Sequence, residues 1–314
     1  YTQTAGGRHG DVATEWRYAA ILSCYNAYMD ADALGLNAMA NASVFSLFPL
    51  KPRYTQPKPS PADWVKAGYL DAAGRVVPET YVTFYVGDYD SAAWLYQRLP
   101  SLWDDPARGA VPLGWAFDPN LSDRFPVGFD WVHRTATPND HFIAGDSGAG
   151  YLNPGFLDGD RPFSHLPSGL PTWEEHCTKY YQQWDISLTG FIIDGDARPM
   201  SDATRAAYAR FSPDGLVAQK LPSYQGLIAN TQTPYLTMND DMPNGDQTDE
   251  ALARIQARLA ADKGDGPHFH IFRTILWSPT QHQKLFARLQ ALPHVRVVDP
   301  YTLMGLLRRH LSGY

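Results

Sequence analysis

Short apolar segments rich in β-branched and aromatic residues recur along the chain, and segments with helical spacing separate them. Most of these apolar segments are bounded by Gly, Pro, Asn or Asp, so the pattern predicts strands joined by turns. The predicted strands are 43–48, 81–86, 111–117, 141–144, 188–193, 224–229, 235–238, 269–275 and 295–298. The Pro-rich stretch 51–61 can be neither a helix nor a central strand and is expected to form an extended surface loop.

The helical pattern is clearest in the C-terminal part of the chain. Apolar residues recur on one face of 249–260, and 301–311 has the same spacing. Between them, Ser278 followed by Pro279 is typical of an N-cap and the first helical turn. Three amphipathic helices are therefore predicted in this part of the chain.

Strands that alternate with helices predict an α/β fold with parallel strands. Seven or more such units favour a TIM-like (β/α) barrel with seven or eight strands, and we expect one domain over 1–314. An open, doubly wound sheet is the alternative. The chain starts with Tyr1 instead of Met, so we expect that a signal peptide or a preceding domain has been removed.

Charge and hydropathy narrow the classes of partner. The formal net charge is −7 and the basic residues are scattered, which argues against nucleic-acid binding. No run of 18 uncharged apolar residues occurs, so no membrane-spanning helix is expected. Cys24 and Cys177 could form one disulfide in an exported protein or remain two buried thiols. The oligomeric state stays open.

Carboxylates follow five of the predicted strands. In a (β/α) barrel the loops after the strands meet the ligand, so these positions would converge at one end of the fold. The acidic residues are Asp88, Asp90, Asp118, Asp146, Asp194, Asp196, Asp240 and Asp241.

Three interpretations of the acidic strand ends compete. Two carboxyl groups could cleave a glycosidic bond, one as proton donor and one as nucleophile or base. The same oxygens could hold Ca²⁺ or another divalent cation, although no cofactor or metal ligand is assigned. Asp is also a common helix cap and turn former, which is the better explanation for any single one of them.

Asp88 and Asp90 are the first candidates for catalytic acids, and Asp240 is the next. If the strand continues through Asp88 and Asp90, their side chains point to the same side. Close carboxylates repel each other, which raises one pKa and produces a proton donor.

A second group of residues is predicted to bind the substrate, because its members lie after strands or offer an aromatic face. With 9 Trp, 18 Tyr and 14 Phe, most aromatic residues are expected in the core, yet a few could stack on sugar rings. The predicted binding residues are Trp115, Asp118, Asp146, Ser147, Tyr151, Asp194, Arg273 and Trp277. His268 and His270, at the start of a strand, are expected to be structural.

The segment 147–154, with the sequence SGAGYLNP, resembles the motif of the GxGYxYP putative glycoside hydrolase family. Gly148, Gly150, Tyr151 and Pro154 match the motif, whereas Asn153 replaces its second Tyr. The earlier segments 86–91 (VGDYDS) and 114–119 (GWAFDP) are similar to further family segments in the expected order. The resemblance implies the C-terminal, catalytic-like domain of an exported bacterial protein, secreted or periplasmic, that handles carbohydrate.

The sequence therefore favours a hydrolase that cleaves glycosidic bonds of an oligo- or polysaccharide with paired Asp carboxylates. A metal-dependent carbohydrate deacetylase and a non-catalytic carbohydrate-binding domain are the alternatives.

Overall fold

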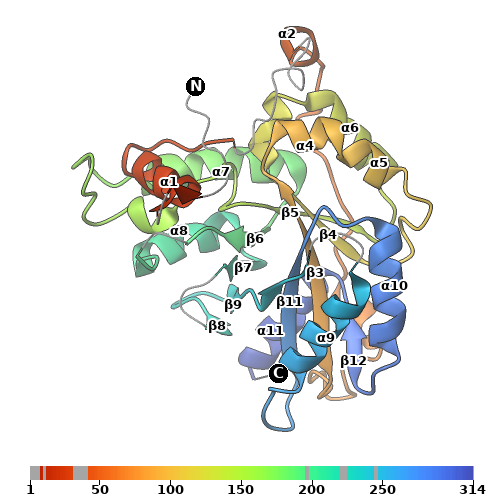
Figure 1. The fold of residues 1–314 in the computed structure, drawn as a ribbon. Coiled ribbons are helices and arrows are strands. Elements are labelled where there is room, and N and C mark those ends of the chain that lie inside the picture. Colours follow the sequence, from red (N-terminus) through yellow and green to blue (C-terminus); the bar gives the residue numbers. More distant parts are fainter. Residues whose placement is uncertain are drawn as a thin grey trace.

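The computed structural model describes residues 8–9, 12–30, 42–194, 198–219, 225–243 and 247–313. Most of the described chain surrounds one ten-stranded sheet with the order β10-β11-β3-β4-β5-β6-β7-β9-β8, and β12 also pairs with β3 (Figure 1). The strands of this sheet are β3 (Thr80–Tyr89), β4 (Leu113–Phe117), β5 (Asp140–Ala144), β6 (Leu188–Ile192), β7 (Gly215–Ala218), β8 (Gln225–Leu227), β9 (Pro234–Thr237), β10 (Asp240–Asp241), β11 (His268–Ile275) and β12 (Val295–Val297). A separate two-stranded sheet pairs β1 (Arg8–His9) with β2 (Val12–Ala13).

The closed barrel of seven or eight strands predicted from the sequence is wrong. The sheet is an open half-barrel of mixed direction, because β8 runs antiparallel to β9 while the other pairings are parallel. The strands at its margins are short: β9 has four residues and β10 has two, compared with ten in β3. Met238 and Asn239 separate β9 from β10, and their N–H groups donate to Ala218 O (2.7 Å) and Ile271 O (3.0 Å).

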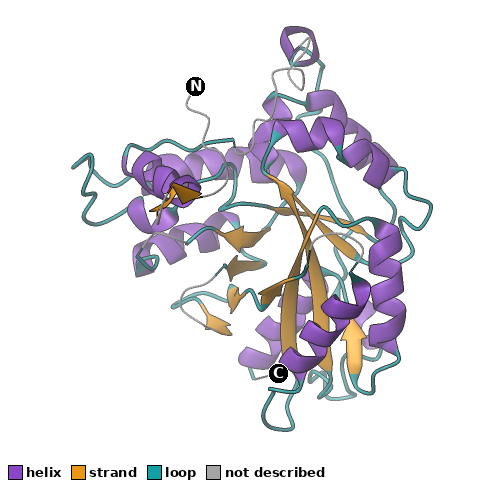
Figure 2. Ribbon diagram, viewed as in Figure 1, coloured by secondary structure: helices purple, strands orange, loops and turns teal. Residues whose placement is uncertain are grey.

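Helices lie around the outside of the strands (Figure 2). Ser278 caps its helix through a capping box, as predicted, with Pro279 in the first turn. The helices are α1 (Thr14–Cys24), α2 (Ala42–Phe45), α3 (Pro61–Lys66), α4 (Ala92–Gln97), α5 (Leu99–Trp103), α6 (Pro126–Thr135), α7 (Leu170–Trp184), α8 (Asp202–Phe211), α9 (Thr248–Leu259), α10 (Pro279–Gln290) and α11 (Pro300–Leu311), with 3₁₀ turns η2 (Pro119–Asp123) and η3 (Pro154–Phe156). None of these helices is both long enough and apolar enough to cross a membrane.

Alternation along β3 divides its side chains between the two faces of the sheet. Val82 and Phe84 pack outward in a cluster with residues of α9 and α10. Tyr81 and Tyr85 point to the inner face, where they share a cluster with residues of α11. The inner face of the half-barrel is thus the place where side chains from neighbouring strands converge.

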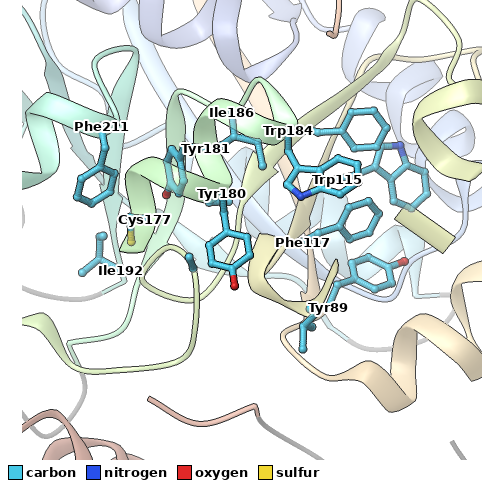
Figure 3. Packing of buried hydrophobic residues seen from close by; sticks show 14 of the residues in the cluster. Tyr89, Trp115, Phe117, Cys177, Tyr180, Tyr181, Trp184, Ile186, Ile192 and Phe211 are labelled. Atoms are coloured by element: carbon cyan, nitrogen blue, oxygen red, sulfur yellow. The ribbon is translucent and has the colours of Figure 1, made fainter. Parts of the chain in front are cut away.

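Most of the aromatic residues are in the core, as composition predicted. Trp115 and Phe117 of β4 pack with Trp184 of α7 on the outer face of the sheet (Figure 3). The Trp115 indole N–H donates to Asp140 Oδ1 at 2.8 Å. Cys24 and Cys177 are both buried free thiols and form no disulfide.

Two sequence predictions of local structure had different outcomes. The stretch 51–60 is extended loop, as predicted from its prolines, and Pro61 begins α3. The predicted strand at 43–48 is wrong, since its first residues belong to the short helix α2; Val44 in this helix and Leu47 in the turn after it are exposed. An apolar run without burial lacks the packing that would hold it in a sheet.

Candidate active site

Three inward-facing residues form the floor of the candidate site. Tyr85 on β3 and Arg273 on β11 are register partners, so they lie side by side on the inner face. The Arg273 guanidinium lies over the Phe191 ring of β6, 4.6 Å from its centroid. Tyr85 is fully buried, and its hydroxyl has no hydrogen-bond partner among the described residues. A buried hydroxyl without a partner costs stability, which is typical of a site that receives a ligand or water.

Asp88 lies at the carboxyl end of β3 beside this floor. Its Oδ1 accepts a hydrogen bond from Arg273 Nη2 at 3.1 Å, in an ion pair whose side chains are 23% and 14% exposed. Asp241 approaches the same guanidinium at 3.7 Å. The backbone of Asp88 is left-handed, with φ of 76°, and the register of β3 on β4 shifts between Val86 and Tyr89. The sequence argument had supposed that the regular strand continues through Asp88 and Asp90. The positive φ and the register shift show that it does not.

Asp118 follows β4 and is buried, and within the part of the chain that the structure describes neither of its carboxyl oxygens has a hydrogen-bond partner. Burial, followed by the charges of Asp146, Asp90 and Asp30, raises its pKa well above the usual range. Burial therefore favours the protonated form of Asp118 over the carboxylate.

Gly145 keeps this part of the site open. A Cβ atom on Gly145 would lie 2.7 Å from Asp118 Oδ1, 3.1 Å from Ala116 O and 3.3 Å from the Tyr85 hydroxyl. Asp118 and Tyr85 thus face the same small space, which only the absence of a side chain at Gly145 leaves free.

Asp146 follows β5 and is 2% exposed, and no described residue forms a hydrogen bond with its Oδ2. Burial raises its pKa to about 7; Arg273 opposes that shift, whereas the charges of Asp88 and Glu15 add to it. At neutral pH the group is therefore divided between its acid and its carboxylate forms, which suits a proton donor.

The buried acids also shift the pKa values of two floor residues, Tyr85 and Arg273. Burial and then Asp146 raise the pKa of Tyr85 well above its usual range, while Arg273 opposes the shift. Burial alone would lower the pKa of Arg273, but the acidic groups around it, Tyr85, Asp146, Asp241 and Asp88, leave it raised. Arg273 therefore remains a cation inside a group of acids.

The glycine-rich loop after β5 is tight, as predicted from its sequence. Ser147 and both glycines adopt positive φ angles, of 70° for Ser147, 129° for Gly148 and 134° for Gly150. Ser147 Oγ donates to Leu152 O (2.6 Å) and accepts from the Ile193 N–H (2.9 Å). Ser147 thus fastens the loop to the end of β6.

The side of this loop that holds Gly150 faces an aromatic residue. A Cβ atom on Gly150 would lie 2.5 Å from the ring of Tyr28, so the glycine is required for this close approach. Tyr28 is 37% exposed, and its ring centroid is 5.1 Å from that of His176. The glycines of the loop motif therefore allow the backbone turn and the close packing of Tyr28 beside the site.

The structure brings some predicted residues together and separates others. Asp88, Asp90, Asp118, Asp146 and Arg273 converge, since each of these acids appears among the charges that act on Tyr85 or Arg273. Asp240 is exposed, and its Oδ1 accepts from the Asp241 N–H at 2.9 Å. Its neighbour Asp241 is the one that reaches Arg273.

Two of the predicted aromatic binding residues, Trp115 and Trp277, lie elsewhere, whereas Tyr151 is buried in the glycine-rich loop of the site. Trp115 is on the outer face, and buried Trp277 donates through its indole N–H to Pro243 O at 3.0 Å. Asp194 is buried directly after β6, whereas Asp196 lies outside the described residues.

Four residues of the site are absent from the predicted catalytic and binding residues: Tyr85, Phe191, Asp241 and Glu15. Tyr85 shares the inward parity of Tyr81 on β3, a signal that alternation could have supplied once the inner face was known. Asp241 directly follows the predicted Asp240, so choosing the second acid of this pair would have identified it. Glu15, which belongs to α1, carries no strand-end signal.

Among the described residues, no three His, Cys, Asp or Glu side chains are grouped so that they could hold a metal ion. His268 and His270 both approach Asp262, at 4.0 and 2.8 Å, which agrees with their predicted structural role.

Comparison with solved structures places the fold among known ones. A crystal structure of a putative hydrolase from Bacteroides thetaiotaomicron VPI-5482 superposes with a TM-score of 0.65 at 16% sequence identity, covering 95% of this chain and 55% of that chain. This chain thus spans about half the length of that protein, and at this identity the likeness is one of fold. A putative polysaccharide deacetylase from Mycobacterium smegmatis reaches a TM-score of 0.46 at 13% identity, covering 83% of this chain and 95% of that one, which is too low to establish a common fold.

No curated protein matches the chain. A family model does, over residues 79–308, and this span contains β3 to β12 with all of the converging acids except Glu15 and Asp30. The resemblance found in the loop after β5 is thereby confirmed, and the chain belongs to the family described as the GxGYxYP putative glycoside hydrolase C-terminal domain.

Proposed function

We propose that this chain hydrolyses glycosidic bonds, with Asp146 as the proton donor and Asp88 as the carboxylate that attacks the sugar or activates a water. The observation that carries the proposal is the unlike state of two neighbouring acids. Asp146 is buried with a pKa raised to about 7, while Asp88 is held in an ion pair with Arg273. Glycoside hydrolysis requires one protonated and one ionised carboxyl group.

The two environments have separate physical causes. Burial disfavours the charged form of Asp146, so the group holds its proton to a pH at which an ordinary Asp is ionised. Asp88 is partly exposed and lies beside the guanidinium of Arg273, which stabilises its negative charge. The proposed pair keeps Asp88 from the sequence prediction and takes Asp146 from the residues predicted to bind substrate.

The other residues of the site have supporting roles in this proposal. In its protonated form, which burial favours, Asp118 would offer a hydrogen-bond donor and an acceptor to a sugar hydroxyl, and the Tyr85 hydroxyl lies beside the same space. Both groups have unsatisfied hydrogen-bonding capacity that a polyhydroxylated ligand would fill. The family, described by its glycoside hydrolase domain, agrees with this chemistry.

The test is a screen of bacterial and plant polysaccharides for released reducing ends, followed by variants. Asp146→Asn and Asp88→Asn should each lower turnover by at least about 100-fold, in the range that general acid catalysis supplies. Asp202→Asn is the matched control, because Asp202 is 87% exposed on α8. Release of sugar that persists in both site variants would overturn the assignment, and binding without release in the parent chain would favour a carbohydrate-binding domain.

A further inference from the structure

Segment 12–30 lies outside the residues that match the family, yet it is bound to the glycine-rich loop of the site. Met29 and Tyr151 form an antiparallel bridge, with N···O distances of 3.0 and 3.1 Å. The Asn153 N–H donates to Ser23 Oγ at 2.8 Å. The end of this segment therefore has a fixed position beside the loop that follows β5.

Tyr28, directly before the bridge, is an aromatic side chain held in place at the surface. Gly150 approaches it so closely that a Cβ atom there would lie 2.5 Å from the ring. The ring centroid of His176, on α7 beside α1 (Figure 1), is 5.1 Å from that of Tyr28, and His176 Nε2 is 2.8 Å from Ala149 O. Tyr28 nevertheless remains 37% exposed. A ring that is already fixed loses little entropy on binding, and its apolar face suits the C–H face of a sugar.

Polar groups lie on the same side of the segment as Tyr28. An antiparallel bridge at Met29 requires extended backbone, so the side chains of Tyr28 and Asp30 point to the same side. Asn120 Nδ2 donates to Asp30 Oδ1 at 3.2 Å, and Arg124 forms an ion pair with the same carboxylate. The Arg124 side chain is 49% exposed and that of Asp30 is 15% exposed. A carboxylate, an amide and a guanidinium group thus accompany the ring, and each can bind sugar hydroxyls.

Asn120 supplies an observation that is independent of the ring. It is 4% exposed, and no described residue forms a hydrogen bond with its Oδ1. A buried amide oxygen without a partner is typical of a place that receives a ligand or a water. Asn120 is in η2, two residues after Asp118, so this group of side chains adjoins the carboxyl end of β4. Its two charges, of Asp30 and Arg124, cancel, which suits an uncharged sugar.

We propose that a sugar ring binds here, further along a chain whose glycosidic bond lies at Asp88 and Asp146. Tyr28 stacks on the C–H face of this ring, and the three polar side chains bind its hydroxyls. The inference rests on the proposed function and gives it a substrate class, which is a long oligosaccharide or polysaccharide of uncharged sugars. It also gives the segment before the family match a role in binding. The residues of this Tyr28 subsite are Tyr28, Asp30, Asn120 and Arg124.

The same contacts would also attach segment 12–30 to the fold, and this structural role alone would explain Tyr28. If Tyr28 were only structural, its loss would loosen the glycine-rich loop and weaken every ligand of the site alike. A subsite acts only on ligands that are long enough to reach it. The length of the ligand therefore separates the two roles.

The primary experiment is isothermal titration calorimetry in the Asp146→Asn chain, which prevents cleavage of the ligand. The probes are cello-, manno-, xylo-, chito- and maltohexaose, each compared with its disaccharide. A hexasaccharide should bind more tightly than its disaccharide. Adding Tyr28→Ala should weaken the hexasaccharide about three- to tenfold, the range that aromatic contacts supply, and the disaccharide much less. Tyr28→Phe keeps the ring and should retain most of the affinity.

Phe45→Ala is the matched control, because Phe45 is also 37% exposed but belongs to α2, and this variant should bind as the parent does. Asn120→Ala tests the polar part and should weaken the hexasaccharide in the same way as Tyr28→Ala. Urea unfolding of each variant verifies that it is folded. An equal loss for both lengths of ligand, an unaffected hexasaccharide, or a chain that binds no hexasaccharide more tightly than its disaccharide would contradict the inference.

Cleavage distinguishes a failure of the subsite from a failure of the proposed function. If the parent chain cleaves a polysaccharide, Tyr28→Ala should lower kcat/KM for that polymer mainly through KM. Binding that depends on Tyr28 in a chain without turnover would refute the glycosidase and leave the subsite in a carbohydrate-binding domain. Cleavage of the polymer with the same KM in Tyr28→Ala would refute the subsite and leave the glycosidase.

Discussion

Two buried aspartates on neighbouring strands, Asp140 and Asp118, are equally exposed, at 1% each, and are treated by the fold in opposite ways. Asp140 begins β5 and accepts from the Trp115 indole (2.8 Å), the Arg108 guanidinium (2.7 Å) and the N–H of Thr137 (2.8 Å). For Asp118, at the carboxyl end of β4, the described residues supply no hydrogen-bond partner to either carboxyl oxygen.

The difference indicates that the amino end of the sheet contributes to stability and the carboxyl end to chemistry. At the amino end a buried charge is compensated by hydrogen bonds and a cation, which is how a buried carboxylate contributes to stability. At the carboxyl end, Asp118 and Asp146 are buried without such a set of hydrogen bonds, and burial raises the pKa of both. A group of this kind costs stability, and proteins retain such groups where they serve chemistry.

The largest change in stability is expected when the hydrogen bonds of Asp140, at the amino end of the sheet, are removed. Asp140→Ala should lower the free energy of unfolding by about 3–5 kcal/mol, because the Arg108 cation and the Trp115 N–H would lose their buried partner. Urea unfolding at pH 7 measures this loss. A loss below about 1 kcal/mol would mean that the hydrogen bonds of Asp140 contribute little to stability, and the proposed difference between the two ends would not hold.

The second prediction concerns the carboxyl end of the sheet, where burial of Asp146 makes the stability of the fold depend on pH. The pKa of Asp146 in the folded chain is raised to about 7, so the folded state binds a proton that the unfolded state has released. The stability contributed by this group is thus present at pH 4 and is lost as the pH rises to 7, by up to about 4 kcal/mol.

Asp146→Asn removes this proton. The stability of the variant relative to the parent should therefore increase between pH 4 and pH 7, as measured by urea unfolding across that range. Other acids have lowered pKa values and vary in the opposite sense, among them Asp130 and Glu174, but they are common to both chains and cancel in the difference. A difference that does not change with pH would place the proton elsewhere.

The contrast between the two ends also shows how far sequence could lead. The strands β3, β4, β5 and β11 were predicted because their segments are apolar and bounded by turn residues, and parallel strands place the acids that follow them at one end. That argument brought Asp88, Asp118 and Asp146 together, and Arg273 with them.

The failures have physical reasons as well. β7, with only four residues, was missed because its apolar segment is short, and the open shape of the sheet depends on the short strands β7 to β10. The sequence could not tell Asp140 from Asp118, since hydrogen-bond partners come from other segments. Glu15 looked like any acid at the start of a helix.

The smallest effect concerns the space at the carboxyl end. Gly145→Ala would place a Cβ atom 2.7 Å from Asp118 Oδ1 and 3.1 Å from the backbone oxygen of Ala116, and that backbone oxygen cannot easily move. The loss of stability should be about 1–3 kcal/mol, as for other overpacked sites, with a larger loss of activity because Asp118 would be displaced. Gly266→Ala is the matched control, since a Cβ atom there meets nothing within 4 Å, and it should stay within about 0.5 kcal/mol of the parent. If Gly145→Ala kept full activity, the space beside Asp118 and Tyr85 would not be where the substrate binds, and the unsatisfied end of the sheet would need another explanation.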